Sequence, residues 1–215
     1  MENLITMLPF VTTALLALHI AGGTTALVTG LLAMLFDKYK KKHRQAGLVF
    51  FWSMNLVTVS AIGLSSIRHN LFLLAIGIFS FYMNFTGYRA IKNKSMKYRW
   101  IDWLVTILAA GTAVFMLSTG NTVLLAFGSI LLFLNYRNTK LQWLNDEERK
   151  EKRPWRYIAH LGNMGGTYIS ALTAFVVVNI NFVKPVWLIW LLPSIIGVPF
   201  IIYYTEVWKK KLHIG

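Results

Sequence analysis

The run LPFVTTALLALHIAGGTTALVTGLLAMLF, residues 8–36, is followed at once by the basic stretch DKYKKKHRQ, residues 37–45, and then by a second apolar run. The first run exceeds the ~20 apolar residues that a helix needs to cross ~30 Å of hydrocarbon. In lipid, a helix is the structure in which one segment satisfies its own backbone hydrogen bonds. This stretch therefore predicts a transmembrane helix that ends at a charged membrane surface.

The same alternation of apolar runs and charged gaps continues along the chain and defines seven apolar segments, of which the fifth is the shortest. The pattern predicts an all-α, polytopic bundle that occupies residues 1–215 as a single integral membrane domain. The seven expected spans are Leu8–Phe36, Ala46–Ile67, Asn70–Ile91, Trp100–Ser118, Asn121–Tyr136, Trp155–Val178 and Pro185–Trp208.

Lys and Arg gather in every second gap between these segments. Residues 37–45 hold five, residues 89–99 five, residues 137–156 seven and residues 209–211 three of the 22 basic residues. The opposite gaps hold only Arg68 and Lys184. Because positive residues stay on the cytosolic side, we expect the N-terminus outside and the C-terminus in the cytosol.

The composition supports a membrane protein. The chain is 56% hydrophobic and 14% charged, whereas a soluble domain carries about 25% charged residues. Its net charge of +14 lies beside apolar spans, so we expect anionic lipid headgroups as partners and no nucleic acid. The chain has no cysteine, which excludes disulfides and thiolate chemistry. Glu2 precedes the first run, so we expect a retained span rather than a cleaved leader.

Small residues recur every four positions in two segments. They are Gly22, Ala26 and Gly30 in the first, and Gly162, Gly166, Ser170 and Ala174 in the sixth. This spacing is typical of helices that approach one another closely in lipid. We expect both stripes to pack against neighbouring helices; the alternative is that the glycines leave room for a ligand.

Polar side chains inside apolar spans are the candidates for function, because ionisable groups at such depth are rare. His19 lies in the first span, and His160 and Asn163 lie one turn apart in the sixth. Asn55 and Asn84 lie deep in the second and third. Together they could line a polar ligand-binding cavity; alternatively, they form hydrogen bonds between helices.

Histidines at matching depths also suggest haem b, since bis-imidazole ligation needs two facing side chains at one level. His43 and His160 share the cytosolic layer, which makes them the candidate metal ligands, and His19 and His69 share the outer half. No single segment carries a His-x-x-x-His pair, so a zinc-hydrolase motif is absent. A hydrolytic or transferase enzyme has no supporting constellation, and we expect no enzyme.

Charged residues near the cytosolic helix ends are expected to pair with one another. Asp102 would pair with Arg99, and Glu206 with a lysine of residues 209–211. The mixed-charge run NDEERKEKR, residues 145–153, predicts a solvated helical turn with i,i+4 pairs, or alternatively a docking site for a partner.

Several motifs resemble one family. They are His19-Ile-Ala-Gly-Gly23, His43-Arg44-x-x-Gly47 and the run from His160 to Phe175. This set resembles the bacterial membrane proteins catalogued as domain of unknown function 2306. The resemblance implies a multi-span helical protein of the bacterial cytoplasmic (inner) membrane and implies no particular activity. His43-Arg44-x-x-Gly47 is also similar to ferric-reductase-like haem membrane domains, which implies haem.

Three candidate functions are consistent with these patterns. The first is handling of a small ligand, ion or proton in a polar cavity lined by His19, Asn55, Asn84, His160 and Asn163. The second is electron transfer through haem b held by His43 and His160. The third is a structural or regulatory membrane subunit whose polar residues only join helices.

Overall fold

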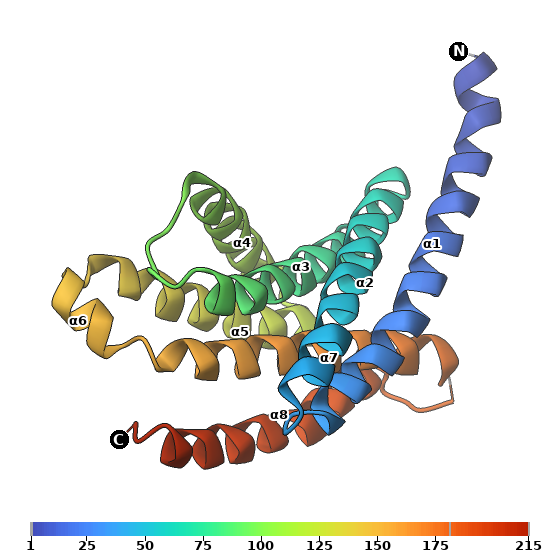
Figure 1. Cartoon of the computed structure of the whole chain (residues 1–215). Helices are drawn as coiled ribbons and strands as arrows, with labels where there is room; N and C mark the ends of the chain where they lie inside the picture. The colour runs from blue at the N-terminus through green and yellow to red at the C-terminus, as the bar shows by residue number, and fades with distance from the viewer. Residues whose placement is uncertain (1, 181, 215) are drawn as a thin grey trace. The chain divides into compact units, whose positions relative to one another are not determined.

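The structure, a computed structural model, describes residues 2–180 and 182–214, with side chains described from residue 8 onward apart from residue 181. Helices make up 85% of the chain, and these ranges contain no strand. Figure 1 shows their arrangement along the chain. The elements are α1 (Glu2–Leu35), α2 (Lys40–Ile67), α3 (Leu71–Lys92), α4 (Trp100–Ser118), α5 (Thr122–Lys140), η1 (Leu141–Trp143), α6 (Asp146–Glu151), α7 (Trp155–Asn179) and α8 (Val186–Lys211).

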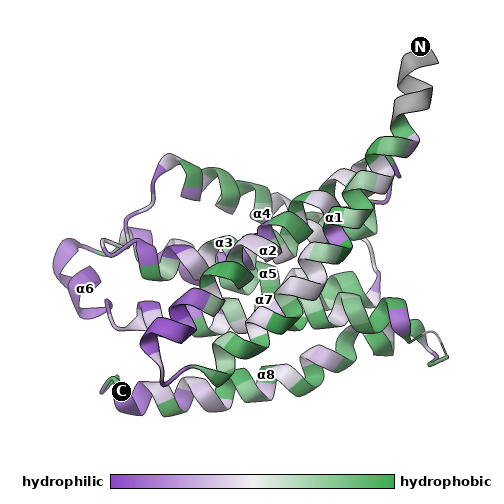
Figure 2. Ribbon diagram, turned by 45° about the vertical axis from the view of Figure 1, so that its right-hand side comes forward, coloured by the Kyte–Doolittle hydropathy of each residue, from purple (hydrophilic) through white to green (hydrophobic). Residues whose placement is uncertain are grey.

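Among the residues that the structure describes, six helices are long and apolar enough to cross a membrane: α1, α2, α3, α4, α7 and α8. The prediction of an all-α multi-pass membrane protein is confirmed. The fifth predicted span corresponds to α5, which is not among the six. The last turns of α5 carry Asn135, Arg137, Asn138 and Lys140, and these lower its mean hydropathy. Figure 2 shows hydrophobic colour along most of α4 and α8 and hydrophilic colour at α6.

The chain divides within α3 into two compact units. The N-terminal unit comprises Met1–Phe81, and the C-terminal unit comprises Tyr82–Gly215. The first contains α1, α2 and the start of α3. The second contains the end of α3 and every later helix, and it contains the candidate site.

In the N-terminal unit, α1 packs on α2 through the predicted stripe. Gly22, Ala26 and Gly30 are buried. A Cβ added at Gly22 would lie 3.2 Å from the Val57 side chain and 3.3 Å from the Ser53 carbonyl oxygen. The small residues on this face therefore let the two backbones approach, and the prediction for the first stripe is confirmed.

In the C-terminal unit, α4 and α5 form a hairpin. Gly120 adopts φ +69° in the turn, a conformation that glycine reaches without strain. Asn121 then begins α5 by accepting the backbone N–H groups of Val123 and Leu124, which is a typical N-cap. Gly128 faces Met116, whose Cβ would lie 2.8 Å from an added Cβ. Two helices of 19 residues each therefore run side by side.

A second hairpin joins α7 and α8 (Figure 1), and it uses different glycines from those predicted. Gly197 faces Ile169, and Gly165 faces Ile201. Of the stripe predicted in this segment, Gly166 contacts Met83 whereas Ala174 is exposed. The most buried series lies one position further along: Asn163, Thr167 and Ala171. The second stripe is therefore confirmed only in part. The four-residue spacing predicts a helical repeat, but it does not predict which face of the helix is buried.

Candidate functional site

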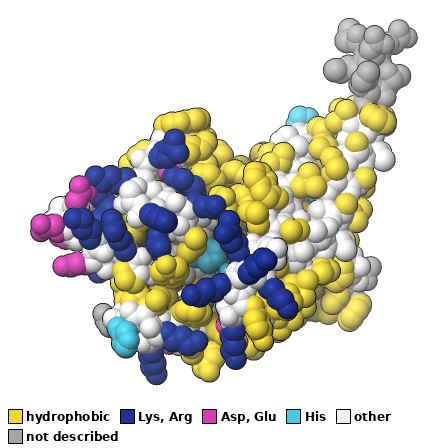
Figure 3. Space-filling model, in the orientation of Figure 1, with side chains coloured by type: hydrophobic (Ala, Val, Ile, Leu, Met, Phe, Trp, Pro, Cys, Tyr) yellow, Lys and Arg dark blue, Asp and Glu magenta, His cyan; other side chains and the backbone are white. Residues whose placement is uncertain are grey.

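The charged helix ends of the C-terminal unit meet at one place, which we call the basic end. It comprises residues 93–99, residues 140–158 with η1 and α6, and residues 208–212. Gln142 accepts the Tyr98 N–H at 2.8 Å and donates to the Met96 carbonyl at 3.0 Å. Lys97 Nζ lies 2.9 Å from Asp146 Oδ1. Figure 3 shows Lys and Arg side chains crowded around the acidic residues of α6.

The mixed-charge run forms the short helix α6. Asn145 caps it by accepting the Glu147 and Glu148 N–H groups, and the Glu148 carboxylate accepts the Asn145 N–H in return. This reciprocal capping box satisfies donors at the helix start. The hydrogen bond and positive charge of Lys97 hold the pKa of Asp146 below its usual value. The predicted helical turn is confirmed.

Arg149 is the exception in this run, because it is buried rather than solvated. It donates to the Leu144 carbonyl at 2.6 Å and to the Gln142 carbonyl at 3.2 Å. Its ion pair with Asp146, at 2.8 Å, spans three residues rather than the expected four. The side chain thereby closes the loop between η1 and α6.

A paired arginine and aspartate join the end of α3 to the start of α4. Arg89 Nε donates to Asp102 Oδ1 at 2.7 Å, and Arg89 Nη2 donates to Asp102 Oδ2 at 2.6 Å. Asp102 Oδ2 also accepts the Arg99 backbone N–H at 2.8 Å. The sequence-based pairing of Asp102 with the Arg99 side chain is therefore corrected. Glu206 pairs with Lys209 at 2.7 Å, within the expected range.

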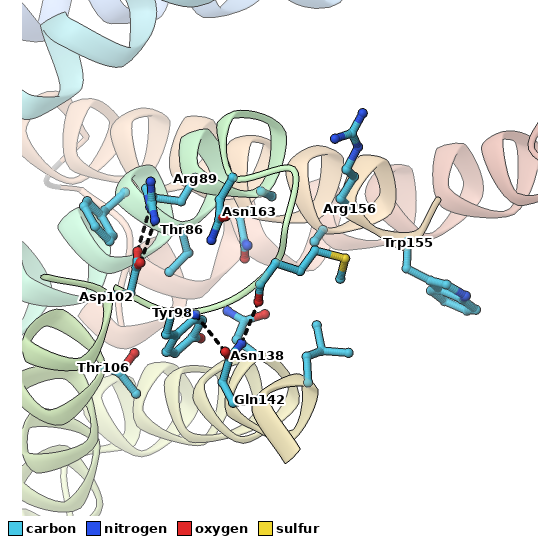
Figure 4. Close-up of a pocket in the computed structure, with 16 residues that line it drawn as sticks. Thr86, Arg89, Tyr98, Asp102, Thr106, Asn138, Gln142, Trp155, Arg156 and Asn163 are labelled. Atoms are coloured by element: carbon cyan, nitrogen blue, oxygen red, sulfur yellow. Dashed lines mark hydrogen bonds and ion pairs between the residues drawn. The ribbon is translucent and has the colours of Figure 1, made fainter. Parts of the chain in front are cut away.

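A cavity of about 80 Å³ opens beside this pair. Figure 4 shows side chains from α3, α4, α5, η1 and α7 converging on it. The Arg156 guanidinium extends away from the Arg89–Asp102 pair (Figure 4) and donates to the Tyr157 hydroxyl at 2.8 Å. The main polar lining residues are Arg89, Tyr98, Asp102, Asn138, Gln142 and Asn163.

Most polar groups around the cavity have partners within the protein. Asn138 Nδ2 donates to the Tyr82 hydroxyl at 3.0 Å, and Asn135 Nδ2 donates to the Thr106 carbonyl at 2.8 Å. Burial raises the pKa of Tyr98 to about 12, so its phenol stays protonated and can donate a hydrogen bond. The walls are thus preorganised by contacts between helices.

Asn163 differs from these residues. Its side chain is 1% exposed, and its Oδ1 has no hydrogen-bond partner among the described residues. An unsatisfied buried polar atom costs about 1–3 kcal/mol. Because Asn163 lines the cavity, a bound polar molecule there would remove this cost. Of the predicted ligand-binding residues, Asn163 is the one that the structure places in the cavity wall.

His160 lies one turn before Asn163 and bonds across to α3. Its Nδ1 lies 2.9 Å from the Gly87 carbonyl oxygen, which can only accept, so Nδ1 carries the proton. A Cβ added at Gly87 would lie 3.1 Å from both Asn163 Cβ and Met164 Cγ. Gly87 therefore permits the close approach that makes this bond possible.

Asn84 is completely buried one turn earlier in α3. Neither His160 nor Asn84 is among the cavity-lining residues.

The other two predicted ligand-binding residues belong to the N-terminal unit. His19 Nδ1 lies 3.1 Å from the Val57 carbonyl oxygen and 3.2 Å from Ser60 Oγ, so it joins α1 to α2. Asn55 donates to the Phe51 carbonyl of its own helix at 2.8 Å. The His19 contacts match the alternative of hydrogen bonds between helices, whereas the Asn55 bond lies within α2.

His43, the other candidate haem ligand, also lies in the N-terminal unit. Its Nδ1 is 2.8 Å from the Ala33 carbonyl oxygen in the last turn of α1. Carbonyls in that turn lack partners within the helix, so His43 acts as a cap. A Nδ1–H donated to a carbonyl is also the usual arrangement of a metal-ligating histidine. The pairing of His43 with His160 stays a prediction, which a Soret band lost in either alanine variant would test.

His19 and His69 are well separated within the same unit. His19 contacts Ser60, whereas His69 follows the end of α2 at Ile67 and is exposed. The helix between them rises by roughly 10 Å, since each residue adds about 1.5 Å. This structure therefore does not bring these two histidines to one level.

Tyr98, Asn138 and Gln142 were missed as site residues. The expected fifth segment ends at Tyr136 and leaves the next residues in a basic gap, whereas α5 continues to Lys140. The signal present in the sequence is the spacing of Asn135, Asn138 and Gln142, which places them on one helical face. No protein-family model, curated protein or solved structure matches this chain.

Proposed function

We propose that this chain is a multi-pass protein of the bacterial cytoplasmic membrane that binds a small, uncharged, hydrogen-bonding solute in the cavity at the basic end. The observation that carries the proposal is Asn163, a residue that lines the cavity and whose buried side-chain oxygen has no hydrogen-bond partner among the described residues. Polar groups buried without partners are rare in native proteins, and those that occur are commonly bonded to water or a ligand.

The charge of the lining favours a neutral solute over an ion. Arg89 and Asp102 neutralise each other through two hydrogen bonds, and the Arg156 guanidinium extends away from them (Figure 4). The remaining polar lining groups are amides, hydroxyls, a protonated phenol and the Trp155 indole, all of them uncharged. An ion entering this space would lose hydration without meeting an opposite net charge. A neutral molecule with hydrogen-bond donors and acceptors would not need an opposite charge in the lining.

The volume limits the solute to a few heavy atoms. A drug-sized ligand occupies about 300–1,000 Å³, whereas this cavity measures about 80 Å³. A water molecule needs about 10–15 Å³ measured in the same way. The space therefore suits a solute the size of acetamide or urea, or a small cluster of waters.

The proposal includes α5 as a seventh span, with the N-terminus outside. The contacts of Gln142 with residues 96 and 98, and of Asp146 with Lys97, bring the end of α5 back to the level at which α4 begins. If α4 crosses the bilayer, α5 returns across it. Its 19 residues rise by roughly 28 Å, close to the hydrocarbon thickness. Membership of the domain of unknown function 2306 family is part of this proposal.

Saturation-transfer NMR on the purified full chain tests the solute. Acetamide and acetate serve as matched probes, since they share size and shape and differ in charge. We expect saturation transfer to acetamide and none to acetate. Asn163→Leu, which keeps the number and branching of the side-chain heavy atoms and removes the amide, is expected to abolish the acetamide signal.

Asn55→Leu is the matched control. It removes the same amide group from the N-terminal unit, where the Asn55 side chain bonds its own helix. Acetamide binding should persist in this variant. Equal acetamide signals from wild-type protein and Asn163→Leu would refute the proposal, as would a preference for acetate.

A further inference from the structure

A second hollow at the basic end has a different chemistry from the cavity. It measures about 340 Å³ and is lined by Lys94, Arg153, Pro154, Arg156, Tyr157 and Leu212. We call it the basic groove. Its residues come from the link between α3 and α4, the start of α7 and the end of α8. Three of the six are cations and none is acidic.

Within the described part of the chain, the cations of the groove lack carboxylate partners. The ion pairs there join Arg89 to Asp102, Lys97 and Arg149 to Asp146, and Lys209 to Glu206. None of these pairs includes Lys94, Arg153 or Arg156. Arg156 packs over the Tyr157 ring, with its guanidinium carbon 4.8 Å from the ring centroid. Three converging cations without an anion form a site that favours a negatively charged ligand.

The neighbourhood of the groove is typical of the membrane interface. Trp155, in the first turn of α7, lies within reach of two cations, Lys152 Nζ at 5.8 Å and Lys209 Nζ at 5.5 Å from the ring. Trp residues with adjacent lysines mark the headgroup level in membrane proteins. The apolar lengths of α7 and α8 extend from this level into the proposed hydrocarbon region.

We propose that the basic groove binds the phosphate headgroup of an anionic glycerophospholipid. Its volume lies within the range of small-molecule sites, unlike the cavity beside Asn163. Basic pockets between transmembrane helices at the headgroup level recognise such lipids. Pro154, Tyr157 and Leu212 supply the apolar contacts that a glycerol backbone and the first acyl carbons require. This proposal goes beyond solute binding and does not depend on it.

Native mass spectrometry of the full chain in detergent tests the site, with phosphatidylglycerol and phosphatidylcholine as probes. We expect wild-type protein to retain phosphatidylglycerol in preference to phosphatidylcholine. Each basic residue beside an anionic headgroup contributes about a fivefold gain in affinity, so Lys94→Gln with Arg153→Gln should weaken phosphatidylglycerol binding about thirtyfold.

Lys140→Gln with Lys150→Gln is the matched control, because it removes the same charge from exposed positions at the basic end that do not line the groove. Its affinity should stay near that of wild-type protein. Lys94→Gln alone, in an exposed position of the link, should weaken binding about fivefold and leave the fold intact.

Equal losses in the groove and control variants would show attraction to general surface charge and would overturn the proposal. So would unchanged binding in the groove variants. Soluble glycerol phosphate is the last arm: if it displaces the lipid at equal concentration, the site recognises a free phosphate rather than a membrane lipid. None of these substitutions changes Arg156 or the Asn163 cavity, so the two proposals fail separately.

Discussion

Arg89 and Asp102 face each other through two parallel hydrogen bonds, at 2.7 Å and 2.6 Å, which join the end of α3 to the start of α4. The planar guanidinium matches the carboxylate, so the pair fixes orientation as well as charge. Asp102 is 5% exposed and Arg89 20% exposed. The pair leaves one wall of the cavity without net charge, which makes it the element that sets the selectivity we propose.

Asp102→Asn is expected to lower the free energy of unfolding by about 2–3 kcal/mol, because it leaves a mostly buried arginine without its counter-ion. It also makes the cavity wall positive, so acetate should replace acetamide as the preferred NMR probe. Denaturant unfolding in micelles measures the first effect. Glu206→Gln, which removes an exposed carboxylate from its pair with the partly exposed Lys209, is the control and should change neither property appreciably.

Gly87→Ala and Gly162→Ala are expected to have opposite effects on stability. The added Cβ at Gly87 would lie 3.1 Å from Asn163 and Met164, so α7 must shift away from α3 at a cost of about 1–3 kcal/mol. At Gly162 it meets no described atom within 4 Å, and alanine should stabilise the helix by about 0.4–1 kcal/mol. Thermal unfolding of both variants measures the difference; equal effects would contradict the close approach at Gly87.

His19→Ala is expected to lower the stability of the α1–α2 pair by about 1 kcal/mol, the usual value of a hydrogen bond between transmembrane helices. Its bonds to Val57 and Ser60 are lost in this variant. Thr24→Ala is the control, since the Thr24 hydroxyl bonds its own helix at Ile20. If His19→Ala abolished solute binding with no change in stability, a chemical role for this histidine would replace the structural one.

The raised pKa of Tyr98 leads us to expect that the protein loses stability at alkaline pH. Its pKa is about 12 in the folded protein and about 10 when exposed. Below pH 10 both states keep the proton, so stability does not depend on this group. Between pH 10 and 12 the unfolded chain loses the proton first, so stability falls as the pH rises. Tyr98→Phe should reduce this slope in unfolding measurements; an unchanged slope would show that Tyr98 is not the group responsible.

Single cysteines test the proposed topology cleanly, because the chain has none of its own. Thr119→Cys, in the turn between α4 and α5, should react with a membrane-impermeant maleimide on intact cells. Ser95→Cys and Glu147→Cys, at the basic end, should react only after the cells are opened. Labelling of positions 119 and 147 from the same side would remove α5 from the set of spans.

Helix positions were well predicted where composition and structure change together. The fourth span was predicted as residues 100–118, and α4 has these bounds. The start of the second span was predicted at Ala46, whereas α2 begins at Lys40. Residues 40–45 are polar but include good helix formers, so the helix continues beyond the apolar run. Hydropathy therefore located the apolar part of α2 and missed its polar first turns.

The candidate site was predicted only in part. Asn163 was named because amides are costly in an apolar span, and it does line the cavity. His19 and His160 were named for the same reason, and His43 was named as a candidate haem ligand. Each of the three bonds a backbone carbonyl of another helix. The cost of burying a polar group is visible in sequence, but whether a neighbouring helix or a ligand offsets that cost is not.

The chain alone determined its helices and the clustering of its charges, because lipid penalises unpaired backbone groups and buried cations wherever they occur in the sequence. Tertiary structure decided that Arg89 faces Asp102 and that Asn163 faces a cavity. Those outcomes depend on how far each helix is rotated and how closely α7 approaches Gly87. Such contacts join residues far apart in the chain, and no local pattern encodes them.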